Sequence, residues 1–274
     1  MNKIANKRIY SKKYTLGKSF RRKTVNIVVS GCCGKMGQVL CNSIEEKDNC
    51  KVCAGVDINS NIGYTFPTFS TVKDLTVEND VIIDFSHPDL LDSLLEFALK
   101  NKKPIVICTT GFSDEQIKKI KIASNDIPVF FSGNMSIGIN LLIELCKVAT
   151  KAIGSNFDIE IIEKHHNQKI DAPSGTALML AEGIGSCLDR KVSYVYDRHL
   201  KREKRSKNEI GIHSIRGGTI VGEHEVILAG NNETISLSHS AQSKEVFAQG
   251  AINAALFLIN KEPGLYNMTD LLKG

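Results

Sequence analysis

The sequence lacks the features that mark membrane proteins and exported proteins. None of its apolar runs reaches the roughly 18 to 20 residues that a membrane-spanning helix requires. The basic N-terminal segment has no apolar core of the kind found in secretory signal peptides. We therefore expect no membrane partner and a cytoplasmic location. Import into an organelle stays open, because transit peptides are also basic and poor in acidic residues.

Acidic residues are absent from the first part of the chain. Residues 1–23 contain nine Lys or Arg and no Asp or Glu, so without them the formal net charge of +5 becomes −4. The net charge therefore does not indicate a nucleic-acid partner. A second basic segment, 201–207, has no aromatic residue on which a base could stack. We predict a disordered basic arm over 1–23, with a targeting peptide or a small electrostatic anchor as alternatives, and no nucleic-acid binding.

The eight cysteines lack the spacing of a disulfide framework, which indicates a reducing compartment. Cys50 and Cys53 form a single Cys-x-x-Cys without the second pair that would complete a zinc site, and on a strand they would face opposite sides. The neighbouring His165 and His166 have no acidic or cysteine ligand at helical spacing. We therefore predict ordinary buried thiols and no metal site.

What is present from Thr24 onward is an alternation of β-branched runs and amphipathic helical segments, which is typical of βαβ units with a parallel sheet. One helix start is marked by Ser113 with Gln116 three residues later, a capping box. The expected strands cover 25–29, 52–56, 81–85, 105–108 and 129–131.

After Asn134 the pattern changes to several strands with few helices. We therefore predict an α/β fold with two domains. A Rossmann-like parallel-sheet domain for nucleotide binding covers 24–133 and 245–274. An α+β domain with an open mixed sheet covers 134–244 and has a different role. A helical segment over 244–259 is expected to pack back on the first domain.

A glycine-rich segment follows the first expected strand. Gly31, Gly34 and Gly37 would let backbone N–H groups reach a pyrophosphate at the positive end of a helix. Asp57 comes twenty residues after Gly37, where a carboxylate would accept hydrogen bonds from a ribose; alternatively it only caps the turn that follows. Lys35 could bind a 2′-phosphate, but no Arg follows Asp57. The sequence thus predicts NADH or NADPH without choosing between them.

A compact group of hydrogen-bond donors follows a second half-buried strand, in the segment 164–177. His165 could supply a proton near neutral pH, and Lys169 a fixed positive charge. Ser174 could cap a new helix and leave the N–H groups of Gly175 and Thr176 for a carboxylate. These residues suit a small anionic ligand. The alternative is a pair of surface histidines followed by a plain helix cap.

The motif E-x-x-x-x-H-H-x-x-K-x-D-A-P-S-G-T-A, residues 160–177, resembles the signature of the dihydrodipicolinate reductase family. The resemblance extends from about residue 25 to the C-terminus and leaves only the basic arm unmatched. It also rests on the segments 31–37, 84–86, 109–112, 134–138, 216–218, 221–224 and 248–251.

This resemblance implies hydride transfer from NADH or NADPH to the ring of a dehydrated 4-hydroxy-tetrahydrodipicolinate, on the route to diaminopimelate and lysine, by a homotetramer. It makes 134–244 the domain for substrate binding and oligomerisation. It makes His165 the general acid and Lys169 its cationic partner, and it assigns the dicarboxylate to His166, Ser174, Gly175, Thr176 and Lys244. It places the coenzyme against Gly31, Cys32, Cys33, Gly34, Lys35, Met36, Asp57, Cys108, Thr109, Thr110, Ser132, Gly133, Asn134 and Met135. Two positions depart from the family pattern: Cys108 stands where many members have Gly, and Lys244 where an Arg can face the substrate.

Two other functions compete with this interpretation. An acylating semialdehyde dehydrogenase or a homoserine dehydrogenase is also a two-domain reductase, and the former would need Cys108 as a thiolate nucleophile. That assignment leaves the paired histidines without a role. A nucleotide-sensing module without catalysis would bind the coenzyme but turn nothing over.

Overall fold

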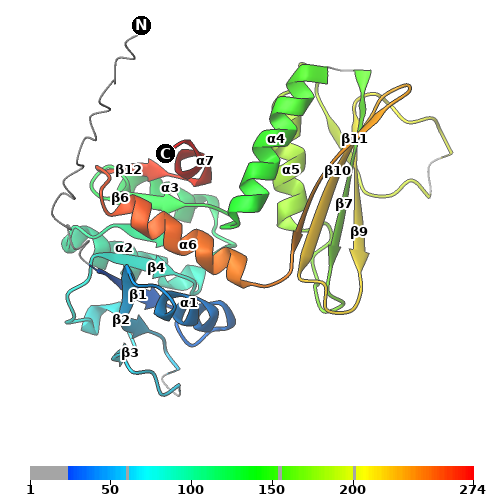
Figure 1. Ribbon diagram of the computed structural model, residues 1–274. Coiled ribbons are helices and arrows are strands. Elements are labelled where there is room, and N and C mark those ends of the chain that lie inside the picture. Colours follow the sequence, from blue (N-terminus) through cyan, green and yellow to red (C-terminus); the bar gives the residue numbers. More distant parts are fainter. Residues whose placement is uncertain (1–23, 60–61, 154–155, 200–201) are drawn as a thin grey trace, which may run out of the picture.

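The computed structural model describes residues 24–59, 62–153, 156–199 and 202–274 (Figure 1). The predicted disordered arm, 1–23, lies outside the described residues. The described strands form two sheets, one of seven strands and one of five. Figure 1 shows the two sheets side by side, with helix α4 (Ile137–Ile153) leading from the first to the second. The predicted fold class is confirmed.

The first sheet has the strand order β12-β6-β5-β4-β1-β2-β3, and its described neighbours all pair in parallel. Its central strands are short apolar runs because helices cover both faces; all four residues of β4, for example, are buried. The strands are β1 (Val25–Ser30), β2 (Cys50–Val56), β3 (Thr68–Phe69), β4 (Val81–Asp84), β5 (Ile105–Ile107), β6 (Pro128–Phe131) and β12 (Gly264–Tyr266).

Two apolar clusters fill the two faces of this sheet. Ile27 and Val29 of β1 pack on one face, whereas Val28 between them packs on the other, as strand alternation requires. The first face is covered by α1 (Lys35–Glu45) and α6 (Glu245–Leu258), and the second by α2 (Leu91–Lys100) and α3 (Asp114–Ala123). Both hydrogen bonds of the predicted capping box are present at the start of α3, between Ser113 and Gln116.

The C-terminal part of the chain returns to the first sheet. Helix α6 packs against α1, and the short strand β12 pairs with β6, followed by α7 (Met268–Lys273). The helix expected over 244–259 is therefore found at nearly its predicted bounds, against the expected partner. This return places the start of α6 beside the loops that leave the sheet.

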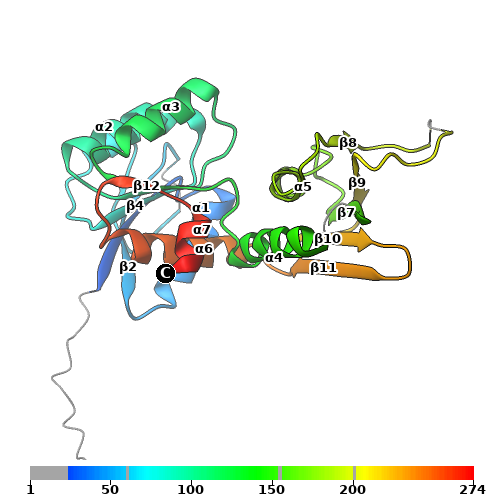
Figure 2. The same ribbon diagram turned by 90° about the horizontal axis from the view of Figure 1, so that it is seen from above.

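The second sheet is mixed and open, with the order β11-β10-β7-β9-β8. Strand β7 pairs antiparallel with β10 and parallel with β9. Helices α4 and α5 (Gly175–Gly185) cover one face of this sheet (Figure 2). Its strands are β7 (Asp158–His165), β8 (Ser193–Val195), β9 (Glu209–Arg216), β10 (Gly222–Ala229) and β11 (Thr234–Ala241).

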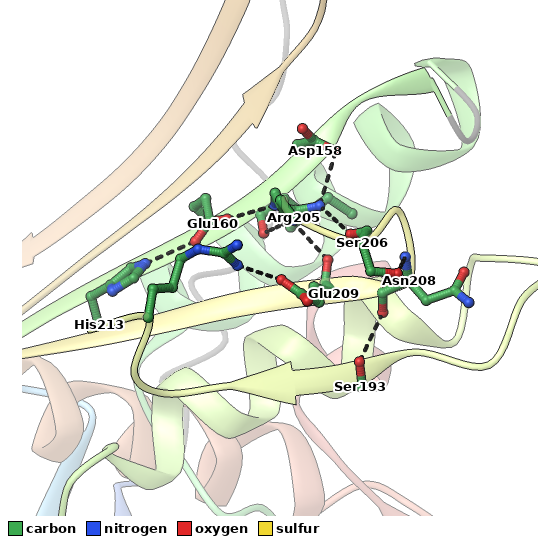
Figure 3. A network of polar contacts seen from close by, with 10 residues as sticks. Asp158, Glu160, Ser193, Arg205, Ser206, Asn208, Glu209 and His213 are labelled. Carbon is green, nitrogen blue, oxygen red and sulfur yellow. Dashed lines mark hydrogen bonds and ion pairs between the residues drawn. The ribbon is translucent and has the colours of Figure 1, made fainter. Parts of the chain in front are cut away.

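The face of the second sheet that α4 and α5 leave uncovered carries charged side chains. Alternation along β7 sends Ile159 and Ile161 to the helices and Asp158 and Glu160 to this uncovered face. Arg205 forms ion pairs with both acids there, and His213 of β9 lies 2.8 Å from Glu160 Oε2 (Figure 3). This polar network fixes the loop after β8 against the strands.

Among the described residues, no helix combines the length and the apolar character needed to cross a membrane.

Candidate active site

A cavity of about 760 Å³ opens where β4, β5 and β6 end. Ligands of open parallel sheets bind beyond the carboxyl ends of the strands. A larger cavity, about 960 Å³, lies at the opposite edge, beside Val25, Pro104 and Pro128, where the strands begin. We therefore take the first cavity as the candidate site. It is lined by Met36, Phe85, Ser86, His87, Pro88, Cys108, Thr109, Thr110, Gly111, Ser132, Gly133, Asn134, Met135, Lys169, Lys244 and Phe247.

The glycine loop between β1 and α1 has a shape that side chains would disrupt. Gly31 has φ +76°, and a Cβ there would lie 2.5 Å from the Phe85 carbonyl oxygen. A Cβ on Gly37 would lie 2.0 Å from the Gly31 carbonyl oxygen, so only glycine lets α1 approach the loop this closely. Helix α1 begins with the exposed Lys35 and has no acid in its first turn. This positive helix end and tight loop fit the pyrophosphate of a dinucleotide.

Asp57 lies directly after β2 and holds two segments together. Its Oδ2 accepts a hydrogen bond from the Cys33 backbone N–H at 2.9 Å, and its Oδ1 accepts one from the Asn59 N–H at 2.9 Å. Asp57 therefore caps the turn that follows it, which was the alternative to a ribose-binding role. It also holds the glycine loop in place through its hydrogen bond with Cys33. A carboxylate has about four acceptor positions, so capacity for a ribose hydroxyl is left.

Asp84 at the end of β4 is a buried carboxyl that organises the cavity wall. It accepts hydrogen bonds from the Thr109 hydroxyl at 2.7 Å and from the Ser86 hydroxyl at 2.5 Å. Burial raises the pKa of Asp84 despite these bonds. Thr109, predicted to line the nicotinamide, is thus fixed in position by a residue to which sequence reasoning assigned no role.

Cys108 directly follows β5 and lines the cavity. Burial raises the pKa of its thiol well above the ordinary value, and Asp84 raises it further. A thiol in these surroundings stays protonated near neutral pH and is a poor nucleophile. This argues against an acylating dehydrogenase, in which Cys108 would have to act as a thiolate.

His165 is the last residue of β7, and its ring is held by Glu163 two residues earlier on the same face of the strand. The distance from His165 Nδ1 to Glu163 Oε2 is 2.5 Å. Because an ionised carboxylate only accepts hydrogen bonds, Nδ1 carries the hydrogen. This leaves Nε2 as the ring atom that exchanges a proton. Burial lowers the pKa of His165, although Glu163 opposes the shift.

Glu163 is fully buried and is the centre of this network. Arg216 of β9 donates to both carboxylate oxygens, at 2.8 and 2.7 Å, and the Ser174 backbone N–H donates at 3.1 Å. Burial alone would raise the pKa of Glu163, but hydrogen bonds from Arg216, Ser214 and His165 outweigh it and lower the pKa to about 2. Glu163 is therefore ionised throughout the physiological range.

Sequence reasoning missed Glu163 and Arg216 as site residues. A signal for Glu163 was available, because residues two apart on a strand point to the same face and Glu163 precedes His165 by two. Arg216 opens the segment 216–218 that contributes to the family resemblance, but no role was assigned to it. It reaches the site because β9 pairs with β7 in a register that sets Arg216 opposite His165.

A second histidine lies behind the first. His224 of β10 is buried, its Nε2 is 3.1 Å from the Ser174 hydroxyl oxygen, and its ring centroid is 5.2 Å from that of His165. Burial lowers the pKa of His224 to about 3, with the neighbouring His165 adding to the shift. His224 is therefore neutral at physiological pH and contributes to the site without a charge.

Ser174 caps helix α5 as predicted, its hydroxyl accepting a hydrogen bond from the Ala177 N–H at 3.1 Å. First-turn N–H groups have no acceptor within their own helix, which leaves those of Gly175 and Thr176 to bind a ligand. The Thr176 hydroxyl accepts a hydrogen bond at 2.8 Å from Asn134, which lines the cavity. This contact joins the helix end on the second sheet to the wall of the first.

The cations of the site come from separate segments. Lys169 and Lys244 both line the cavity, although they are 75 positions apart in the sequence. Lys169 forms an ion pair with Asp171 at 2.9 Å, and Lys244 precedes the first turn of α6. His166 is partly buried and, among the described residues, its Nδ1 has no hydrogen-bond partner. The arrangement provides positive charge for an anionic ligand.

The predicted residues thus form three adjoining groups. Ten of them line the cavity itself: Met36, Cys108, Thr109, Thr110, Ser132, Gly133, Asn134, Met135, Lys169 and Lys244. The loop residues Gly31, Cys32, Cys33, Gly34 and Lys35, with Asp57, lie at the turn that contributes Met36. His165, His166, Ser174, Gly175 and Thr176 are not among the lining residues and adjoin the cavity through the Asn134–Thr176 hydrogen bond.

The family matches cover both parts of the chain. Residues 25–135 match the family description "Dihydrodipicolinate reductase, N-terminus", and residues 138–272 match "Dihydrodipicolinate reductase, C-terminus". The chain belongs to the dihydrodipicolinate reductase family. The resemblance drawn from the motif around His165 is therefore confirmed.

Curated relatives agree with this assignment. A 4-hydroxy-tetrahydrodipicolinate reductase from Caldanaerobacter subterraneus subsp. tengcongensis is 53% identical over 249 residues, covering 91% of this chain and 98% of the relative. The enzyme of the same name from Clostridium tetani is 48% identical, covering 90% and 97%. A solved dihydrodipicolinate reductase from Paenisporosarcina sp. TG-14, with dipicolinate bound, has 25% identity and a TM-score of 0.75, and the match covers 89% of this chain and 97% of that one.

Proposed function

We propose that this chain reduces 4-hydroxy-tetrahydrodipicolinate, by way of dihydrodipicolinate, to tetrahydrodipicolinate with NADH or NADPH, in diaminopimelate and lysine biosynthesis. The observation that carries the proposal is the Glu163–His165 pair at the end of β7, which the Ser174 N–H joins to the start of helix α5, next to the cavity at the carboxyl edge of the parallel sheet. Its curated relatives bear the name of this activity. The solved relative was obtained with dipicolinate bound.

In the proposed reaction the site has two tasks: it binds a dianion, and it delivers a proton. The reduced nicotinamide supplies the hydride when it is bound. The N–H groups of Gly175 and Thr176 and the ammonium group of Lys169 bind the substrate carboxylates. Hydride addition to a conjugated imine leaves an enamine, which needs a proton at the neighbouring carbon. His165 Nε2 delivers that proton, while Glu163 holds the ring and stabilises its charged form.

Bound substrate should favour this role of His165. Burial lowers its pKa in the free protein. A dianion next to the ring stabilises the imidazolium and raises the pKa again. His165 therefore takes up the proton that it delivers after the substrate has bound. Because an anionic substrate raises the pKa of His165, this arrangement supports a dicarboxylate substrate over a neutral substrate.

A coupled assay tests the proposal. The substrate is generated in place by dihydrodipicolinate synthase, and oxidation of NADH and of NADPH is followed by absorbance. Turnover that depends on the generated substrate supports the proposal. Tight coenzyme binding without any turnover would instead support a nucleotide-sensing module.

We expect NADH to be used at least as well as NADPH. The Asp57 carboxylate lies at the end of β2, where it suits ribose hydroxyls and repels a 2′-phosphate, and no Arg follows it. Lys35 is the nearby cation of the loop and is exposed. Comparing kcat/KM for the two coenzymes tests this, and strict dependence on NADPH would contradict it.

Replacing Thr176 with Val should mainly weaken substrate binding. The change removes the hydroxyl that accepts the Asn134 hydrogen bond, and a bond of this kind contributes about 0.5–1.5 kcal/mol. We expect KM to rise roughly 3- to 10-fold with little change in kcat, since the acid stays in place. Thr234→Val on the exposed end of β11 is the control. A fall in kcat without a change in KM would assign Thr176 to chemistry instead.

We also propose the functions of the two domains and the homotetramer that were expected from the sequence. Residues 24–133 with 245–274 bind the coenzyme, and residues 134–244 bind substrate and form a homotetramer. The uncovered face of the second sheet, where Ile215 is 46% exposed, is the surface we propose for subunit contact. Light scattering of the purified protein tests the tetramer.

The eight free thiols support a reducing compartment such as the cytoplasm.

A further inference from the structure

Two adjacent cysteines lie in the glycine loop, and the fold brings a carboxylate to them. The Sγ atoms of Cys32 and Cys33 are 3.8 Å apart. Asp57, 24 residues further along the chain, is held against them by the hydrogen bond from the Cys33 N–H to its Oδ2. The sulfur atoms and a carboxylate oxygen all lie within 4.8 Å of one another. Among the described residues, these three side chains form a group whose ligand atoms are close enough together to share one metal ion.

The spacing of the sulfur atoms matches that of a tetrahedral metal site. Zinc binds thiolate sulfur at about 2.3 Å, so two sulfurs on one tetrahedral ion lie roughly 3.8 Å apart. The loop shows this separation, 3.8 Å. Carboxylate oxygen is a regular third ligand of zinc, at about 2.0–2.2 Å. The three ligand atoms lie within 4.8 Å of one another, so the carboxylate oxygen would have to move closer to the two sulfur atoms to complete the site.

The surroundings of the group allow an ion to enter and to keep one open position. Cys32 is buried and packs against Gly55, whereas Cys33 and Asp57 are partly exposed. An ion would therefore be approached from the side of Cys33 and Asp57. Three protein ligands with a water in the fourth position are typical of zinc sites that are not purely structural. Binding of the ion displaces the thiol protons. The two thiolates so formed and the carboxylate select a soft divalent ion over Mg²⁺ or Ca²⁺.

We propose that Cys32, Cys33 and Asp57 bind a soft divalent cation, Zn²⁺ by its ligand preferences, and that this ion and the nicotinamide coenzyme exclude each other. The exclusion rests on the proposed function, which assigns the same loop and the same carboxylate to the coenzyme. An ion on Asp57 occupies the carboxylate that would hold the ribose, and it fixes the loop whose N–H groups would hold the pyrophosphate. Metal binding would thereby inhibit the reductase reversibly.

The binding experiment uses Cd²⁺ alone as the probe, because thiolate–Cd²⁺ bonds give an ultraviolet charge-transfer band. The wild-type protein, titrated without coenzyme or substrate, should bind one Cd²⁺ per chain and develop the band. Cys33→Ser should lose it. Cys53→Ser is the matched control, since Cys53 is a partly buried thiol on β2 that hydrogen-bonds to the Ile27 carbonyl oxygen, and this variant should keep the band. Thermal unfolding checks that each variant is folded.

A second variant tests the carboxylate. Loss of an outer-shell partner lowers metal affinity about 10- to 100-fold, so loss of a ligand should cost at least as much. Asp57→Asn should therefore weaken Zn²⁺ binding, measured by competition with a chromophoric chelator, by about tenfold or more. An unchanged Cd²⁺ band in folded Cys33→Ser, or no band in the wild type, would overturn the metal site.

A competition experiment tests separately whether the ion and the coenzyme exclude each other. Saturating NADH should abolish the Cd²⁺ band of the wild type, and Cd²⁺ should raise the apparent Kd for NADH, followed by nicotinamide fluorescence. A band that persists at saturating NADH would refute the exclusion. The Cd²⁺ titration needs no turnover, so a protein without reductase activity that still binds the ion would contradict the proposed function and leave the metal site standing.

Discussion

Replacing His165 with Gln should lower kcat by about 10²- to 10⁴-fold, the usual loss when a general acid is removed. Glutamine preserves the approximate size of the ring and one hydrogen bond to Glu163, which is 2.5 Å from His165 Nδ1. It has no transferable proton. KM and coenzyme binding should change little, because the carboxylate-binding N–H groups of α5 and the glycine loop are untouched.

Steady-state kinetics with the coupled assay measures kcat and KM, and nicotinamide fluorescence measures coenzyme binding. His199→Gln is the matched control, because His199 is exposed in the loop after β8 and is not among the residues that line the cavity. It should keep wild-type turnover. If His165→Gln retained nearly full kcat while folded, His165 would not be the proton donor, and His166 would become the candidate.

Replacing Glu163 with Gln should have the largest effect on stability. The change leaves the Arg216 guanidinium without the carboxylate that it contacts through two hydrogen bonds. Breaking a buried ion pair by removing one partner costs about 3–5 kcal/mol in unfolding free energy. We expect the lower end of that range, because the Arg216 side chain is 20% exposed and keeps the carbonyl oxygens of Ile215 and Asp171 as acceptors. The kcat should fall as well, because the ring of His165 loses the group that orients it. Chemical denaturation and kinetics measure the two effects.

The same residue predicts how stability depends on pH. The pKa of Glu163 is lowered from an ordinary 4.5 to about 2, so the folded state binds its proton more weakly than the unfolded state. Its contribution is therefore present above about pH 4.5 and lost as the pH falls toward 2. Integrated over that interval, it amounts to about 3 kcal/mol.

Denaturation curves recorded between neutral pH and the acid limit of folding test this dependence. The wild type should lose more stability than Glu163→Gln over the same interval, since the variant cannot titrate there. Glu233→Gln is the control, because its side chain is exposed in the turn between β10 and β11. Parallel curves for the wild type and Glu163→Gln would show that Glu163 is not the group responsible.

Local patterns were sufficient for most of the helices and long strands. The capping box placed the start of α3 within one residue of its observed position, because its two hydrogen bonds join residues three apart. The strands β3, β8 and β12 were not anticipated. They have two or three residues each, too few to show alternation, and they exist because they pair with neighbours distant in sequence.

The sequence by itself determined the glycine loop, the strand that ends in His165 and the helix that begins after Ser174, because each depends on neighbouring residues. It could not determine which distant groups complete them. Arg216 lies 53 positions from Glu163, Thr176 lies 42 from Asn134, and Asp57 lies 24 from Cys33. Only strand register and the packing of α5 against the first sheet's loops bring these pairs within hydrogen-bonding distance. The charge on Glu163, the position of His165 and the cysteine–carboxylate group are therefore properties of the tertiary structure.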